Sequence, residues 1–124
     1  MIKRLGVLTS GGDAPGMNAA IRAAVLTAAA HNIDVIGFRH GFNGLLEDDS
    51  QTLLPQHVQH IIQQGGTILK SARCKALHTD AGARQAADTL HRLQLDALLI
   101  IGGDGSFRGA LAIAPYYRGQ IIGV

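Results

Sequence analysis

Residues 97–106, which read ALLIIGGDGS, decide the fold class of this 124-residue chain. The stretch from Ala97 to Ile101 is continuously apolar, as is typical of a strand buried on both faces of a parallel sheet. Glycines follow at once, and the sequence from them to Ala114 predicts a short helix. A buried strand that leads through a glycine turn into a helix is half of a β-α-β unit, so we expect an α/β protein.

The same order of elements recurs towards both ends of the chain. The apolar patterns predict further strands over residues 5–9, 34–38 and 120–124, and an extended segment over 65–69. They predict helices over residues 17–31, from Pro55 through positions 58, 61 and 62, and from the N-cap Thr79 to Leu93. The segment 41–49, with two glycines and three consecutive acidic residues, is predicted to be a loop. The pattern therefore favours a Rossmann-like three-layer sandwich with a mostly parallel sheet.

The composition excludes several classes of function. Apolar residues make up 47% of the chain and charged residues 16%, with a net charge of +2, so the chain is too apolar to remain disordered. Aromatic residues are scarce at 4% and the basic residues are dispersed, which argues against nucleic acid as a partner. Cys74 is the single cysteine, and no signal peptide or membrane span is visible. We expect a cytoplasmic protein that has no membrane partner.

The 16 glycines are concentrated where strands are predicted to end. Three groups stand out, at residues 11–16, 65–66 and 102–109, and the first and third follow strands and open helices. Backbone N–H groups in such turns, together with a helix N-terminus, favour phosphate. Neither turn is a Walker A motif, because Met17 and Asn18 replace Lys and Ser or Thr, and no G-x-G-x-x-G is present. The alternative for the first turn is a tight connection that needs only glycine geometry.

Asp104 lies inside the third glycine turn, where its carboxylate would repel a phosphate unless a cation lay between them. Magnesium that bridges Asp104 and the phosphates would resolve this conflict. The alternative is that Asp104 is a plain helix N-cap. His57 and His60 are three residues apart on a predicted helix, but no third ligand is near them in the sequence, so we do not expect a metal there.

Three motifs carry a family resemblance. Residues 9–18 (TSGGDAPGMN), 65–73 (GGTILKSAR) and 101–106 (IGGDGS) resemble, in order and spacing, the bacterial-type ATP-dependent 6-phosphofructokinases of the phosphofructokinase A family. The resemblance implies transfer of the γ-phosphoryl group of Mg-ATP to the 1-hydroxyl of fructose 6-phosphate, in glycolysis, by a cytoplasmic homotetramer. An allosteric kinase with Mg²⁺ as cofactor is expected on this basis.

The resemblance also implies roles for particular residues. Gly12 would contact the ATP phosphates, Arg73 and Cys74 would border the nucleotide, and the turn Gly103, Asp104, Gly105 and Ser106 would cradle it. Asp104 would bind magnesium, and the glycine at 105 favours ATP, because pyrophosphate-dependent relatives tend to carry an acidic residue there. Arg73 would be catalytic, since a permanently charged guanidinium can hold the oxygens of the transferring phosphoryl group.

The sequence departs from the family pattern at three positions. Lys70 stands where the family usually has glycine. In the effector site Arg22 is kept, but Leu26 and Pro55 replace basic residues that allosteric members commonly carry. These replacements argue against regulation by ADP or phosphoenolpyruvate.

The end of the chain is the largest departure. After Val124 the family continues into a loop whose aspartate is the general base, and then into a second domain that supplies most sugar-phosphate contacts. Residues 1–124 are therefore expected to be an N-terminal nucleotide-binding portion that lacks the sugar-phosphate domain, binds Mg-ATP weakly and does not phosphorylate fructose 6-phosphate. Two alternatives stay open: a non-catalytic nucleotide-binding fragment or pseudo-subunit, and another kinase with the GGDG loop, such as relatives of NAD kinase and diacylglycerol kinase.

Overall fold

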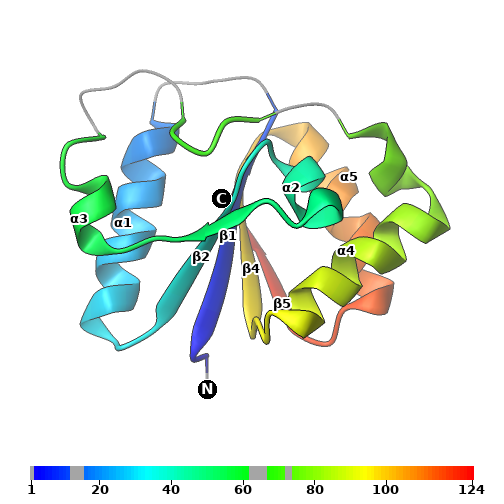
Figure 1. Cartoon of the computed structure of the whole chain (residues 1–124). Helices are drawn as coiled ribbons and strands as arrows, with labels where there is room; N and C mark the ends of the chain where they lie inside the picture. The colour runs from blue at the N-terminus through cyan, green and yellow to red at the C-terminus, as the bar shows by residue number, and fades with distance from the viewer. Residues whose placement is uncertain (1, 12–15, 62–66, 72–73) are drawn as a thin grey trace.

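A computed structural model describes residues 2–11, 16–61, 67–71 and 74–124, and for residues 104–106 it describes the backbone alone (Figure 1). Five strands alternate with helices along the chain. The strands are β1 (Arg4–Ser10), β2 (Asp34–Phe38), β3 (Ser50–Thr52), β4 (Ala97–Gly102) and β5 (Gln120–Gly123). The α-helices are α1 (Met17–Ala30), α2 (Phe42–Glu47), α3 (Pro55–Val58), α4 (Asp80–Arg92) and α5 (Asp104–Ile113), and the 3₁₀ helices are η2 (Lys75–His78) and η3 (Ala114–Tyr116).

The strands form one sheet in the order β3-β2-β1-β4-β5. β1 lies at the centre and pairs in parallel with β2 and with β4, which in turn pairs in parallel with β5. β3 is antiparallel to β2 at one edge. The predicted α/β class and mostly parallel sheet are confirmed.

Helices cover both faces of the sheet, with α1 and α3 on one side and α2, α4 and α5 on the other (Figure 1). Alternate residues of the central strand serve the two cores: Val7 packs with Ile21 and Val25 of α1, whereas Leu8 packs with Leu90 of α4 and Ile113 of α5. All six of these side chains are almost fully buried. The pairing of parallel strands with helices on both faces explains why the strand sequences are continuously apolar.

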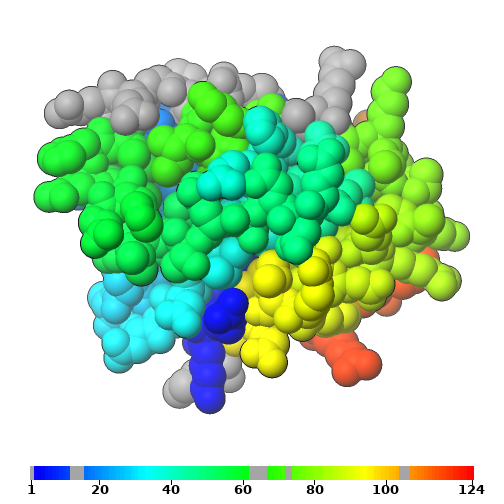
Figure 2. Space-filling view, viewed as in Figure 1, coloured from blue at the N-terminus to red at the C-terminus, as the bar shows by residue number. Residues whose placement is uncertain are grey.

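Two predicted segments have a different structure. Residues 41–49 were expected to be a loop, but residues 42–47 form α2, whose Leu45 is buried in the core. The edge strand β3, which was not predicted, follows them, and its Gln51 pairs with Gly37 of β2. The space-filling view shows the segment from α2 to α3, coloured cyan to green, across the front of the molecule (Figure 2). The extended segment predicted over 65–69 is wrong for residues 67–69, which form a turn, and Gly65 and Gly66 lie outside the described residues.

Candidate functional site

The carboxyl ends of β1 and β4 meet where the strand order reverses. β1 pairs with β2 on one side and with β4 on the other, and the β1–β4 register runs as far as Ser10 opposite Gly102. An ideal Cβ on Gly102 would lie 2.3 Å from the carbonyl oxygen of Ser10, so the close approach of the two backbones requires glycine there. In open α/β sheets, ligands bind outside the carboxyl ends of the strands at such a reversal.

Both strands continue into a glycine turn and a helix. Gly11 follows β1 with φ +88°, and an ideal Cβ on it would lie 4.0 Å from the amide nitrogen of Gly103, so the two turns are neighbours. Gly16 is the N-cap of α1 and Gly103 is the N-cap of α5. Because glycine has no side chain, neither cap residue can accept a side-chain hydrogen bond from the first N–H groups of its helix. Two helix N-termini at one end of the sheet suit an anion such as phosphate.

A third segment, residues 67–71, is fastened to the same end of the sheet. The hydroxyl of the fully buried Thr9 donates to the carbonyl oxygen of Lys70 (3.0 Å) and lies 3.1 Å from the hydroxyl of Thr67. Because the Thr9 proton is used on Lys70, the Thr67 hydroxyl donates to Thr9, and it accepts from the N–H of Leu69 (3.2 Å). The Ser71 hydroxyl donates to the carbonyl oxygen of Gly11.

Two further hydrogen bonds fix this segment. The N–H of Ile68 donates to Oδ1 of Asn18, on the first turn of α1, at 2.7 Å. The N–H of His40 donates to the carbonyl oxygen of Leu69 at 2.9 Å. The segment is therefore held by β1, by α1 and by the turn before α2. Sequence reasoning did not identify Thr9, Asn18 or Thr67 as the residues that hold segment 67–71. The only signal for this contact in the sequence is a polar residue, Thr9, at the end of an apolar strand.

The model of the family described as phosphofructokinase matches residues 4–124. This chain belongs to the phosphofructokinase family. An ATP-dependent 6-phosphofructokinase of Halothermothrix orenii is 48% identical over 123 residues, which are 99% of this chain and 37% of that protein. One of Brevibacillus brevis is 50% identical over 109 residues, which are 88% of this chain and 34% of that protein. The chain thus spans about a third of the length of these curated relatives.

Solved phosphofructokinase structures have the same fold. The T-state enzyme of Pichia pastoris superposes with a TM-score of 0.90 at 34% identity, covering 100% of this chain and 15% of that chain. The phosphofructokinase of Saccharomyces cerevisiae superposes with a TM-score of 0.88, also at 34% identity, covering 98% of this chain and 20% of that one.

The structure places some of the predicted nucleotide-binding residues. Gly103 caps α5, and Asp104, Gly105 and Ser106 form the first turn of that helix, so Asp104 is the first helical residue rather than its N-cap. This position excludes the N-cap alternative for Asp104. Cys74 is the residue before η2, half-buried against the core on the α4 side of the sheet. Gly12 and Arg73 lie outside the described residues, and their roles stay predictions.

The predicted effector residues of the phosphofructokinase family lie on one face of the sheet. Arg22 and Leu26 are half-buried on α1, and Pro55 begins α3. The Nε atom of Arg22 is buried and has no hydrogen-bond partner among the described residues. Arg22 and the apolar Leu26 lie on successive turns of α1. The absence of regulation by ADP or phosphoenolpyruvate stays a prediction.

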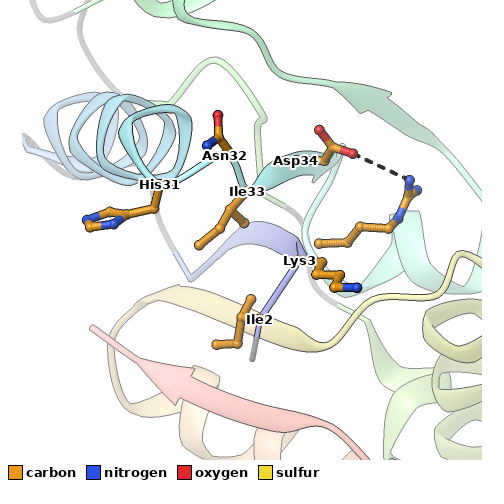
Figure 3. Close-up of a pocket in the computed structure, with 7 residues that line it drawn as sticks. Ile2, Lys3, His31, Asn32, Ile33 and Asp34 are labelled. Atoms are coloured by element: carbon orange, nitrogen blue, oxygen red, sulfur yellow. Dashed lines mark ion pairs between the residues drawn. The ribbon is translucent and has the colours of Figure 1, made fainter.

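The opposite end of the sheet carries an open hollow of about 850 Å³ (Figure 3). It is lined by residues 2–4 of β1 and its approach and by residues 31–34 between α1 and β2, and the Arg4–Asp34 ion pair spans 3.9 Å across it. Nearby, the N–H groups of Lys3 and Arg4 donate to Asp96, and these two hydrogen bonds lower the pKa of its carboxyl group. The hollow lies at the amino ends of the strands and does not coincide with the glycine turns.

Among the described side chains, including those of His57 and His60, no group of three or more His, Cys, Asp or Glu residues could share a metal ion. Asp48 and Asp49, which follow α2, form ion pairs instead, Asp48 with Arg92 (3.0 Å) and Asp49 with Arg39 (2.7 Å). Within the described residues, no helix has the length and apolarity needed to cross a membrane.

Proposed function

We propose that this chain forms the Mg-ATP site of an ATP-dependent 6-phosphofructokinase, whose whole chain phosphorylates D-fructose 6-phosphate to fructose 1,6-bisphosphate in glycolysis. The observation that carries the proposal is the meeting of the Gly11 and Gly103 turns at the N-termini of α1 and α5. The two relatives from Halothermothrix orenii and Brevibacillus brevis are named ATP-dependent 6-phosphofructokinases, which supports the class of reaction.

The ATP phosphates would be bound mainly by the two glycine turns. Backbone N–H groups from Gly12 and from residues 103–106 would donate to phosphate oxygens, and Cys74 would border the nucleotide beside Arg73. The Arg73 guanidinium would hold the oxygens of the γ-phosphoryl group as negative charge shifts during transfer. Phosphoryl transfer depends on such positioning and charge stabilisation, so these residues would orient the phosphoryl donor.

Magnesium fits the residues at this place. Asp104 begins α5 directly after Gly103, in the same turn as the proposed phosphate donors. Mg²⁺ is commonly held by one or two carboxylates together with substrate phosphates. When bound, it would neutralise part of the phosphate charge, and Asp104 would fix its place.

The family resemblance supports further proposals about the whole protein. We propose a cytoplasmic homotetramer that acts on ATP and fructose 6-phosphate, with neither nucleic acid nor a membrane as partner. Arg22 would contribute to an effector site, although Leu26 lacks the charge that a phosphate effector requires. The second candidate function is nucleotide binding without catalysis, as in a pseudo-subunit.

Isothermal titration with ATP in the presence of magnesium tests the site. We expect the Asp104→Asn variant to bind Mg-ATP about tenfold more weakly, since it loses a charged ligand, and to bind ATP in EDTA no more weakly than the unaltered chain does. The matched control is Asp88→Asn, which removes the same charge from an exposed position on α4 and leaves binding unchanged. Equal magnesium dependence in all three proteins would contradict the metal assignment.

A coupled assay with fructose 6-phosphate separates the two candidate functions. The 124-residue chain is expected to show no turnover above background, and a protein that extends it to the length of the relatives is expected to be active. An inactive longer protein that still binds Mg-ATP would favour the pseudo-subunit.

A further inference from the structure

Lys70 has an unusual backbone conformation. Among the described residues, five that are not glycine have positive φ: Asn32, His40, Asp48, Lys70 and Gln94. Asn32, Asp48 and Gln94 follow the ends of α1, α2 and α4, where a left-handed residue commonly terminates a helix. His40 forms the turn with Gly41 that leads into α2. Lys70 (φ +62°) ends no helix, and its long side chain gives it no local reason to adopt this region.

The surrounding hydrogen bonds impose this conformation. The carbonyl oxygen of Lys70 accepts from the buried Thr9 hydroxyl, and its N–H donates to the carbonyl oxygen of Thr67 at 3.3 Å. On either side, Leu69 is fully buried and the Ser71 hydroxyl is bonded to Gly11. The backbone at residue 70 must therefore bend sharply between the core residue Leu69 and Ser71, which is bonded to the first glycine turn, and a glycine would make this bend without strain.

The side chain of Lys70 is exposed near the glycine turns, and no hydrogen bond or ion pair among the described residues accounts for its position there. It is exposed at the carboxyl end of the sheet, one residue from the contact between Ser71 and Gly11. The ion pairs among the described side chains join Arg4, Arg39 and Arg92 to aspartates, and none involves Lys70. A residue that is held in a strained conformation at such a place is best explained by a function of its side chain.

We propose that Lys70 is a phosphate-binding residue of this site, and that its ammonium group contacts the triphosphate of the bound nucleotide. This inference rests on the proposed function, because the glycine turns at the same end of the sheet are what would hold the phosphates. The long, flexible stem and three N–H donors of lysine suit a mobile polyphosphate chain. The strain at position 70 is then offset by the charge that the side chain brings to the anion.

Substitutions at position 70 separate the charge from the backbone effect. We expect Lys70→Met to weaken binding of Mg-ATP about fivefold to tenfold in isothermal titration, and to weaken binding of inorganic tripolyphosphate by a similar factor. Lys70→Arg, which keeps the charge, should bind within about twofold of the unaltered chain. Lys70→Gly should weaken binding as Lys70→Met does while raising the melting temperature, because glycine relieves the left-handed strain.

Gln94 is the matched control for the backbone effect. It too has a left-handed backbone (φ +58°) and an exposed side chain, but it lies just before β4, at the opposite end of the sheet. Gln94→Gly should therefore raise the melting temperature and leave the affinity for Mg-ATP unchanged.

The outcomes distinguish the two levels of the proposal. If the unaltered chain fails to bind Mg-ATP, the proposed function and the role of Lys70 both fall. If it binds and Lys70→Met binds equally well, or if Lys70→Arg is as weak as Lys70→Met, the role of Lys70 alone falls. A loss seen with Mg-ATP but not with tripolyphosphate would place Lys70 against the nucleoside and would likewise overturn the phosphate contact.

Discussion

At the scale of single residues, the hydroxyl of Thr9 connects the fold to the candidate site. Its hydrogen bonds tie the end of the central strand to Thr67 and Lys70, which are 58 and 61 residues away in the sequence. A buried hydroxyl can satisfy two partners only when all three groups are correctly placed, so this contact fixes the path of residues 67–70.

We expect Thr9→Val, which keeps the shape of the side chain, to lower the free energy of unfolding by about 1–3 kcal/mol, because buried partners lose their hydrogen bonds. The affinity for Mg-ATP should also fall, since residues 67–71 are no longer fixed. Urea unfolding and isothermal titration measure the two effects. Thr9→Ser keeps the hydroxyl and should retain most of the affinity, and a Thr9→Val protein as stable as the unaltered chain would show that the hydroxyl chain is unimportant.

At the scale of elements, the phenol of Tyr117 joins the segment after η3 to the start of β4. Its hydroxyl donates to the carbonyl oxygen of Leu95 at 2.6 Å, beside the carboxylate of Asp96. Burial, and then the negative charge of Asp96, raise the pKa of Tyr117 to about 12. The folded state therefore favours the protonated phenol.

This shift predicts a loss of stability in alkali. The contribution of Tyr117 should be complete below the ordinary tyrosine pKa of about 10 and should be lost as the pH rises towards about 12, because the unfolded chain gives up the proton first. Tyr117→Phe should remove this dependence and lower the free energy of unfolding at pH 7 by about 1 kcal/mol. Urea unfolding at pH 7, 10 and 11 measures both effects, with Tyr116→Phe as the control. If the free energy of unfolding of Tyr117→Phe fell with pH as steeply as that of the unaltered chain, the loss of stability in alkali would not come from Tyr117.

The elements also show how far the sequence alone could be interpreted. The apolar strands and the helices α1 and α4 were predicted because burial on a regular face leaves a periodic pattern. β3 was missed because its three polar residues form a strand only by pairing with β2, and α2 because glycine at 44 lowers its helix propensity. In the site, the glycine turns could be predicted from the positions of the glycines in the sequence. The contacts of Thr9 with Thr67 and of Ser71 with Gly11 could not, because they join distant parts of the chain.

At the scale of the whole molecule, the two edges of the sheet differ in character. β3 presents Ser50, Gln51 and Thr52, whereas the side with α5 and β5 exposes large apolar side chains. Phe107 and Leu111, one helical turn apart on α5, are 67% and 72% exposed, and a hollow of about 240 Å³ lies beside them against Ile100 and Ile121. Exposed apolar patches of this kind lower solubility.

We expect the double variant Phe107→Gln, Leu111→Lys to be more soluble and to bind less of a hydrophobic fluorescent dye, with an unchanged melting temperature, because both side chains already lie in water. Precipitation in ammonium sulfate and dye titration measure this. Leu54→Gln, an exposed leucine at the start of α3, is the control and should change either quantity little. Equal solubility of the two variants would mean that the α5 face is not the limiting surface.

The central place of β1 has a consequence for the order of events on the ribosome. Its partner β4 begins at Ala97, so β1 is synthesised more than 90 residues before the strand that completes its pairing. At about 5–20 residues per second, the nascent chain spends about 5–20 s with one side of its middle strand unpaired. α1 and β2 can cover half of β1 during that interval, and the other half must be kept from competing chains until β4 emerges. The first strand to be synthesised is therefore among the last to gain partners on both sides.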